Sequence, residues 1–339
     1  MFRLKYYFIL LLSILFFLQG CKNKPLNETK ILRLAHGLDI SHPVHKGMEY
    51  MAKRVKELSG NKLNLKIYPS EQLGTERQCL EMLQIGSLDI TKVSAAVMEG
   101  FVPEYRALGM PYLFRNNEHK IQVLSSEIGK EILHSGTNYW LRGLCFYDAG
   151  SRSFYTVDKP IRKPSDLKGM KIRVMLSITS VKLVNAMGGS STPISYGELY
   201  TALQNGVVDG AENNPPTFYL SHHYEACKYY SLDQHSVIPD VLLISMHTWN
   251  KLSDEEKKWV SQAAEESWEK QIIYWEKSEK ESLEAVKKAG VEIIYPDQEP
   301  FRKIVQPVYE YFKKRNPKVY ELAERIRNFK VDSTKIDSN

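Results

Sequence analysis

The sequence predicts an α/β protein built from two lobes that share a cleft. Its 339 residues exceed one ordinary core and suit two domains. Stretches of alternating apolar residues lie between stretches of helical periodicity, the order typical of β-α-β units. Residues 83–89 and 203–209 also share the pattern L-Q-x-G-x-x-D, each after a capped helix and before a strand. We therefore expect two lobes of similar plan, each presenting a strand end to the cleft.

The charge of the chain argues against a nucleic-acid partner. The formal net charge is +6, which is small for this length, and basic residues are interspersed with acidic ones. Proteins that bind nucleic acid typically gather positive charge on one face. We expect no DNA or RNA partner.

The first 21 residues have the layout of a secretion signal. Arg3 and Lys5 form a charged end, residues 6–18 an apolar body, and the tetrapeptide L-Q-G-C ends at Cys21. The tetrapeptide resembles a bacterial lipobox, in which the cysteine becomes the lipid-modified first residue. A membrane-spanning anchor is the alternative, but the apolar run is shorter than the roughly 20 residues that cross a bilayer. We expect a lipoprotein signal at 1–21, a polar tether at 22–30, and an extracytoplasmic, periplasmic protein held by a lipid anchor.

Three cysteines, Cys79, Cys145 and Cys227, remain after the leader. An odd number leaves at least one thiol unpaired in an oxidising compartment, and the spacings match no zinc pattern. Buried free thiols are favoured over one disulfide with a spare cysteine.

The first β-α-β unit is predicted at the start of the mature chain. Residues 31–35 and 63–68 read as strands, and residues 43–58 as a helix capped by Ser41. Three histidines crowd the loop before this helix: His36, His42 and His45. Histidine is a common metal ligand, but no acidic or cysteine partner lies at a zinc-site spacing. Polar lining or a helix start is the favoured role, and we expect no metal and no cofactor.

Cleft candidates follow in both lobes. Thr75 and Gln78 predict a capping box, and the following strand is expected over 88–93. Around this unit, Glu76 lies at the helix start and Lys92 and Ser94 at the strand end.

A further candidate follows the strand predicted over 140–147. Gly150 indicates a sharp turn or a lobe crossing, and Arg152 lies just beyond it. The alternative for Arg152, as for Arg173 in the next segment, is an ordinary surface salt bridge; the ligand role is favoured for Arg173 and less so for Arg152.

The stretch 165–214 carries the main candidates. Residues 171–175 are predicted as a strand, so Arg173 is fixed close to a sheet. A capping box at Ser195 starts a helix over 196–205, and a strand follows over 207–211. Two amides, Asn213 and Asn214, then fall just past a strand end, where open α/β sheets bind ligands.

A long helix is predicted from a capping box at Ser253 to about Gly290. At 1.5 Å per residue it is about 55 Å long, which exceeds one lobe, so it is expected to brace both. A strand over 291–295 and helices over 301–315 and 317–329 follow, with a disordered tail at 330–339.

Several of these segments, in order, resemble the solute-binding proteins of TRAP transporters, of the DctP type, over residues 31 to about 329. The matching segments are S-H-P-V-H-K-G, Q-L-G-T-E-R, P-Y-L-F-R, D-L-K-G-M-K-I-R-V, G-E-L-Y-T-A-L-Q-N-G-V-V-D-G-A-E-N and the long helix. The resemblance implies a two-lobed periplasmic solute-binding fold with a hinge, with lobe I at 31–149 plus 239–278 and lobe II at 150–238 plus 279–329.

The resemblance also implies roles for single residues. Arg173 matches the arginine that grips the ligand carboxylate, and Arg152 and Asn213 match the second arginine and the asparagine. The positions that reach the ligand in some members are matched by Glu76, Ser94, Tyr196 and His36. The chain departs from the family at Ser151, where many members have an aromatic residue, and at Asn214, where many have proline; both leave the details of the pocket open. The segments Y-D-A-G-S-R-S-F-Y and D-G-A-E-N-N look similar to the branch that takes sugar acids such as hexuronates.

The residues fit an organic-acid ligand. A guanidinium forms two parallel hydrogen bonds with a carboxylate, and the surrounding donors and acceptors suit hydroxyl groups better than a second carboxylate. A sugar acid is therefore favoured over a C4-dicarboxylate. The lobes are expected to close on the acid and then to dock on a membrane permease. A secreted sugar-acting enzyme and a lipid-anchored adhesion protein are the alternatives, although the chain has no G-x-S-x-G, H-E-x-x-H or phosphate-loop motif.

Overall fold

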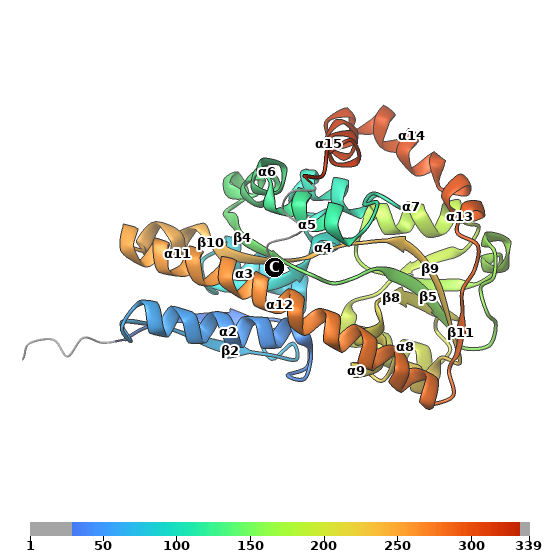
Figure 1. The fold of residues 1–339 in the computed structure, drawn as a ribbon, viewed down its shortest axis with the longest axis horizontal. Helices are drawn as coiled ribbons and strands as arrows, with labels where there is room; N and C mark the ends of the chain where they lie inside the picture. Colours follow the sequence, from blue (N-terminus) through green and yellow to red (C-terminus); the bar gives the residue numbers. More distant parts are fainter. Residues whose placement is uncertain (1–28, 333–339) are drawn as a thin grey trace, which may run out of the picture.

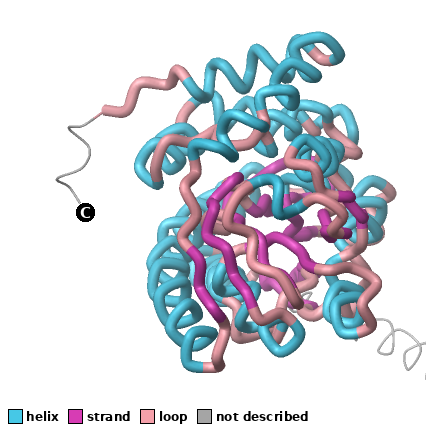
Figure 2. Tube along the Cα trace, turned by 90° about the vertical axis from the view of Figure 1, so that its right-hand side faces the viewer, coloured by secondary structure: helices cyan, strands magenta, loops and turns pink. Residues whose placement is uncertain are grey.

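The computed structural model describes residues 29–332, and within them the strands form two sheets. The first sheet has the order β2-β1-β3-β10-β4 and the second the order β11-β9-β5-β8-β6-β7. Figure 1 places the first sheet in the left half of the molecule and the second in the right half, and Figure 2 shows the strands enclosed by helices. The predicted signal with Cys21, most of the tether and most of the tail lie outside the described residues.

The first sheet is mixed. Its strands are β1 (Lys30–Ala35), β2 (Leu63–Tyr68), β3 (Ile90–Ser94), β4 (Leu141–Tyr147) and β10 (Asp240–Ser245). β1 pairs in parallel with β2 and β3, whereas β10 runs antiparallel between β3 and β4. Its helices are α2 (Pro43–Leu58), α3 (Glu76–Gln84), α4 (Ala95–Met98), α5 (Asn117–Ser125), α6 (Glu127–Ser135) and α11 (Met246–Lys251).

The second sheet is also mixed. Its strands are β5 (Arg152–Thr156), β6 (Lys171–Val174), β7 (Ser190–Pro193), β8 (Gly210–Asn213), β9 (Tyr229–Ser236) and β11 (Glu292–Ile294). β5 runs antiparallel between β8 and β9, while β6 pairs in parallel with β7 and β8. Its helices are α7 (Ile178–Ala186), α8 (Leu199–Gln204), α9 (Pro215–Leu220) and α10 (His223–Ala226).

Two short segments carry the chain between the sheets. One joins the end of β4 to the start of β5, and the other joins β9 to β10. Because Asp240 pairs with Tyr147 and Arg152 pairs with Ser236, the two segments run antiparallel between paired strand ends. A relative movement of the two sheets would bend the chain at these segments, so we place the hinge of the predicted lobes there.

α12 (Asp254–Lys288) is the predicted long helix, and it extends beside both sheets (Figure 1). Ser253 and Glu256 form the expected capping box at its start. Its buried Gln271 donates to Asp148 O and accepts from Asp148 N, both at 2.8 Å, next to the first crossing segment. α12 also packs closely on α2, because a Cβ at Gly47 would lie 2.8 Å from Gln271 Cβ. α12 is therefore hydrogen-bonded to the first crossing segment.

The C-terminal helices α13 (Glu299–Ile304), α14 (Gln306–Arg315) and α15 (Pro317–Arg327) return over the upper face of the molecule (Figure 1). Their buried side chains, such as Phe301, Phe312 and Ile326, share one apolar cluster with residues of both sheets. This cluster joins the end of the chain to both halves.

Local differences from the sequence predictions have simple causes. His42 rather than Ser41 caps α2, because the His42 side chain accepts from Val44 N. Ser195 and Glu198 contact each other only through their side chains, and a 3₁₀ turn, Tyr196–Glu198, precedes the short α8. β8 starts at Gly210 and so ends at Asn213, which lies in the strand and not beyond it.

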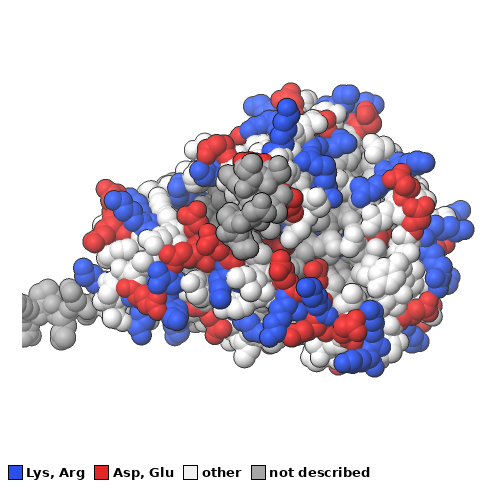
Figure 3. Space-filling view, in the orientation of Figure 1, with Lys and Arg blue, Asp and Glu red and all other residues white. Residues whose placement is uncertain are grey.

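Three further features bear on the sequence analysis. Cys79, Cys145 and Cys227 are free and buried. No helix within residues 29–332 is long and apolar enough to cross a membrane, and no group of three metal-ligating side chains occurs in the same range. On the face shown in Figure 3, basic and acidic side chains are interspersed.

Candidate functional site

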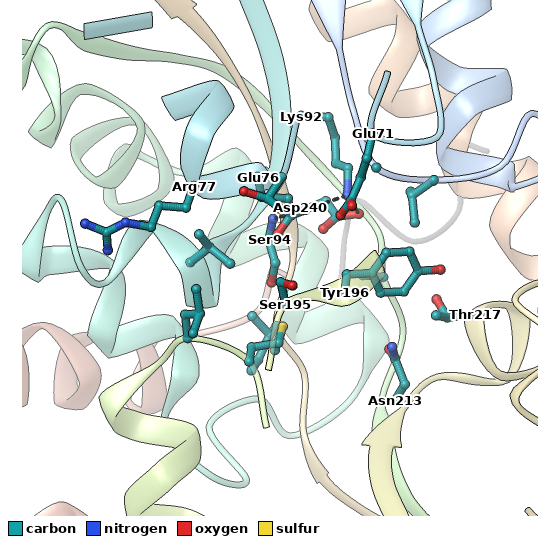
Figure 4. Close-up of a pocket in the computed structure, with 18 of the residues that line it drawn as sticks. Glu71, Glu76, Arg77, Lys92, Ser94, Ser195, Tyr196, Asn213, Thr217 and Asp240 are labelled. Atoms are coloured by element: carbon teal, nitrogen blue, oxygen red, sulfur yellow. Dashed lines mark hydrogen bonds and ion pairs between the residues drawn. The ribbon is translucent and has the colours of Figure 1, made fainter. Parts of the chain in front are cut away.

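A cavity opens between the two sheets, and its wall gathers side chains from distant parts of the chain. Eight of the nine predicted ligand residues line it: Glu76, Lys92, Ser94, Arg152, Arg173, Tyr196, Asn213 and Asn214. Further lining residues that the sequence analysis did not single out are Glu71, Asp240, Thr217 and, in this role, His42. Figure 4 shows Glu71, Glu76 and Lys92 of the first lobe on one side of the cavity and Tyr196, Asn213 and Thr217 of the second lobe on the other.

Arg173 is the one guanidinium of the wall that is held in place but not neutralised. It lies in β6, is 2% exposed, and its Nε donates to Ile194 O at 2.9 Å. Its two Nη atoms have no hydrogen-bond partner, and no carboxylate pairs with it among the described residues. Burial lowers the pKa of Arg173, because the charged form has lost its water. The side chain therefore presents a fixed fork of donors to an incoming anion.

Arg152, in contrast, is already neutralised by its neighbours. Its Nε and Nη2 donate to the Glu212 carboxylate, and Nη2 also donates to Glu212 O at 2.7 Å. Nη1 donates to Asn213 Oδ1 at 2.7 Å, which leaves one N–H of the guanidinium free. Burial opposes the charge, but Glu212 raises the pKa of Arg152, while Arg152 and His235 lower the pKa of the buried Glu212 to about 2. Arg152 therefore stays ionised but has its charge balanced by Glu212, and it has at most one donor left for a ligand.

The wall of the first sheet is rich in acceptors. Lys92 lies 3.0 Å from Glu76 Oε1 and 3.3 Å from Asp240 Oδ2, and the same Glu76 oxygen accepts from Ser94 N (Figure 4). Burial alone would lower the pKa of Lys92, but the charges of Asp240 and Glu76 raise it. Two carboxylates, Glu76 and Asp240, pair with the single ammonium, and a third, Glu71, lines the same side of the cavity, so the carboxylates outnumber the ammonium there. Arg77, also part of the lining, pairs with Glu81 and points away from the group.

The amides and the tyrosine complete the wall of the second sheet. Asn213 Oδ1 accepts from Arg152 and from Asn214, so the Nδ2 group of Asn213 is left to donate elsewhere. Asn214 caps α9 by accepting from Thr217 N at 2.8 Å. Tyr196 bonds to Ser221, and its ring packs on the apolar cluster of the other lobe. Of these residues, Asn213 keeps the clearest unused donor.

His36 is the predicted residue that does not line the cavity. Its Nε2 lies 2.9 Å from His45 Nδ1, and its Nδ1 accepts from Leu38 N, which places it behind the wall. Burial together with Lys92 and His45 lowers the pKa of His36 to about 2, so the ring is neutral. His42 reaches the cavity instead, 3.3 Å from Thr217 of the other lobe. The histidines thus belong to the support of the wall and to a contact between lobes.

The departures at Ser151 and Asn214 have different consequences. Asn214 faces the cavity and caps a helix, as described above. Ser151 does not line this cavity but a second one, together with Gly150, Ser236 and Trp275. The serine at position 151, where many family members have an aromatic residue, therefore removes no aromatic side chain from the ligand cavity.

The family model described as "Bacterial extracellular solute-binding protein, family 7", or DctP, matches residues 34–315. The chain belongs to this family. The protein is a solute-binding subunit of a TRAP transporter and not an enzyme. The members of the family work outside the cytoplasm, bind small acids and act together with membrane permeases. The predicted fold class and family are thereby confirmed.

Similar proteins include two solved structures. A TRAP solute-binding protein of Bradyrhizobium, in complex with D-galacturonate, is 38% identical, with a TM-score of 0.86 and coverage of 88% of this chain and 100% of that one. A TRAP solute-binding protein of Anaerococcus prevotii, with bound D-glucuronate, is 36% identical, with a TM-score of 0.85 and coverage of 88% and 97%. The uncharacterized protein YiiZ of Salmonella typhimurium is 39% identical and covers 88% of this chain and 92% of its own.

Proposed function

We propose that this TRAP subunit captures a sugar acid of the hexuronate type and presents it to the permease in the closed form. The observation that carries the proposal is the polarity of the cavity. The second lobe contributes the unpaired guanidinium of Arg173 beside the paired Arg152, and the first lobe contributes Glu76 and Asp240, which pair with Lys92, together with the further carboxylate of Glu71.

A ligand with one carboxylate and several hydroxyl groups fits this polarity. Its carboxylate takes the two free Nη atoms of Arg173, and Asn213 Nδ2 can donate to a neighbouring oxygen. Its hydroxyl groups donate to Glu76 and Asp240 on the opposite wall. A second carboxylate would meet like charge there, which disfavours a C4-dicarboxylate. The similar proteins that hold galacturonate and glucuronate support the same choice.

Thermal-shift titration of the mature protein tests the proposal. D-glucuronate, D-galacturonate and aldonates are expected to raise the Tm, and succinate and malate are expected to raise it much less at equal concentration. Stabilisation by succinate or malate alone refutes the sugar-acid assignment in favour of a dicarboxylate. Recovery of unchanged sugar after incubation serves as the control for turnover.

We also propose that the mature chain is held at the membrane through a lipid on Cys21. The tetrapeptide L-Q-G-C after a charged and apolar leader supports this proposal. Mass spectrometry of the membrane fraction should find Cys21 as a diacylated N-terminal residue, and a Cys21→Ser variant should appear in the soluble fraction. An unmodified Cys21 within a longer chain contradicts it.

A further inference from the structure

Glu71 stands out because its backbone is strained and its side chain crosses the cleft. Ser70 and Glu71 have φ values of 53° and 56°, a left-handed conformation that is unfavourable for residues other than glycine. The loop is fixed by hydrogen bonds from Glu71 N to His36 O at 3.1 Å and from Ser70 N to Leu38 O at 3.0 Å. The fold therefore holds Glu71 in one place despite the strain, as is common for functional residues.

The Glu71 side chain fills the gap between two glycines of opposite lobes. On its own lobe, a Cβ at Gly37 would lie 3.2 Å from Glu71 Cγ. On the other lobe, a Cβ at Gly197 would collide with Glu71 Oε2, so the Glu71 carboxylate lies directly against the Gly197 backbone. Gly197 belongs to the 3₁₀ turn that precedes α8, so this contact joins the two lobes across the rim of the cavity.

The second carboxylate oxygen of Glu71 is unsatisfied. Glu71 Oε1 is buried and accepts no hydrogen bond from any described residue, although Glu71 lines the cavity. Burial raises the pKa of Glu71, against the opposing effect of the Gly197 N–H. A buried acceptor without a partner has a free-energy cost, because it has lost its water and gained no donor. A donor supplied by a ligand would remove that cost.

We propose that Glu71 couples cleft closure to ligand identity: its carboxylate packs against the Gly197 backbone only when the lobes are closed, while Oε1 accepts from a hydroxyl of the bound ligand. The proposal rests on the assignment of a polyhydroxylated acid to this cavity. A ligand with a hydroxyl at this position satisfies both oxygens and favours the closed form. An acid that lacks this hydroxyl leaves Oε1 unpaired, and closure around it is less favourable.

Calorimetric titration with D-glucuronate and its monodeoxy analogues tests the coupling in Glu71→Asn. Asparagine tolerates the left-handed conformation, so this variant is expected to fold with an unchanged or higher Tm. Its Kd for D-glucuronate should rise tenfold or more. The wild type should bind one monodeoxy analogue more weakly than it binds D-glucuronate. Glu71→Asn should bind this analogue and D-glucuronate with equal affinity, because the contact between Glu71 and the missing hydroxyl is already absent in the variant. Glu284→Gln, on the exposed face of α12, is the matched control and should keep the wild-type Kd.

A second variant tests the contact between Glu71 and Gly197 of the other lobe. Gly197→Ala should weaken D-glucuronate binding, since its methyl group collides with Glu71, and should add little to the loss in Glu71→Asn. A Kd of Glu71→Asn for D-glucuronate within twofold of the wild-type Kd overturns the proposal. The proposal also falls if every monodeoxy analogue loses as much affinity in Glu71→Asn as it does in the wild type. If the wild type binds neither D-glucuronate nor D-galacturonate, the sugar-acid assignment itself falls, and the wild-type titration alone reveals this.

Discussion

The substitution Arg173→Lys separates the geometry of the anchor from its charge. Arg173 offers two free Nη atoms in a plane fixed by the bond of its Nε to Ile194 O. Lysine keeps the charge but loses this bond and offers a single ammonium, so one of two charge-assisted hydrogen bonds is lost. Such a bond contributes about 1.5–3 kcal/mol, which corresponds to a rise in Kd of about 10- to 150-fold. Isothermal titration calorimetry of the wild type and of Arg173→Lys with D-glucuronate measures this change in Kd.

Two further variants make the Arg173 test specific. Arg162→Lys changes an exposed arginine that pairs with Glu292 and should leave the Kd unchanged. Arg173→Met removes a buried charge that has no carboxylate partner, so the ligand-free protein should keep or raise its Tm while the ligand-induced shift disappears. A Kd for Arg173→Lys within threefold of the wild type refutes the bidentate role.

The remaining predictions concern stability. Burial alone would lower the pKa of His235, but Asp233 and Glu212 raise it to about 9. Because this value exceeds the ordinary pKa of about 6.5, the protonated His235 stabilises the folded protein. This contribution is complete below pH 6.5 and is lost as the pH rises through 9. Urea unfolding should give a lower free energy of unfolding at pH 9 than at pH 6.5, and His235→Gln should reduce this difference. An unchanged difference between the two pH values in His235→Gln contradicts the role given to His235. Gln271→Leu leaves the N–H and C=O of Asp148 unpaired and should lower the unfolding free energy by about 2–4 kcal/mol, and a loss below 0.5 kcal/mol would show that α12 does not hold the crossing segment.

Much of the fold was readable from local sequence because its signals are local. The capping boxes at Thr75 and Ser253 form as predicted, since each needs only residues three apart. β2 has the predicted bounds, because its alternation is clean. The end of β8 was misplaced because a glycine-rich stretch carries little periodicity, and the strand is set by its pairing with β5.

For the cavity, the sequence by itself determined which polar residues stand near strand ends and helix starts, and therefore the chemistry available to a ligand. Only the tertiary structure decided which of those groups are free. Arg152 and Arg173 look alike in sequence, but the pairing of β5 with β8 sets Glu212 against Arg152 and leaves Arg173 without a carboxylate. Likewise, Glu71 reaches the cavity through two left-handed residues and a neighbour in the other lobe. Hydrogen-bond partners distant in sequence settle these roles, and no local pattern encodes them.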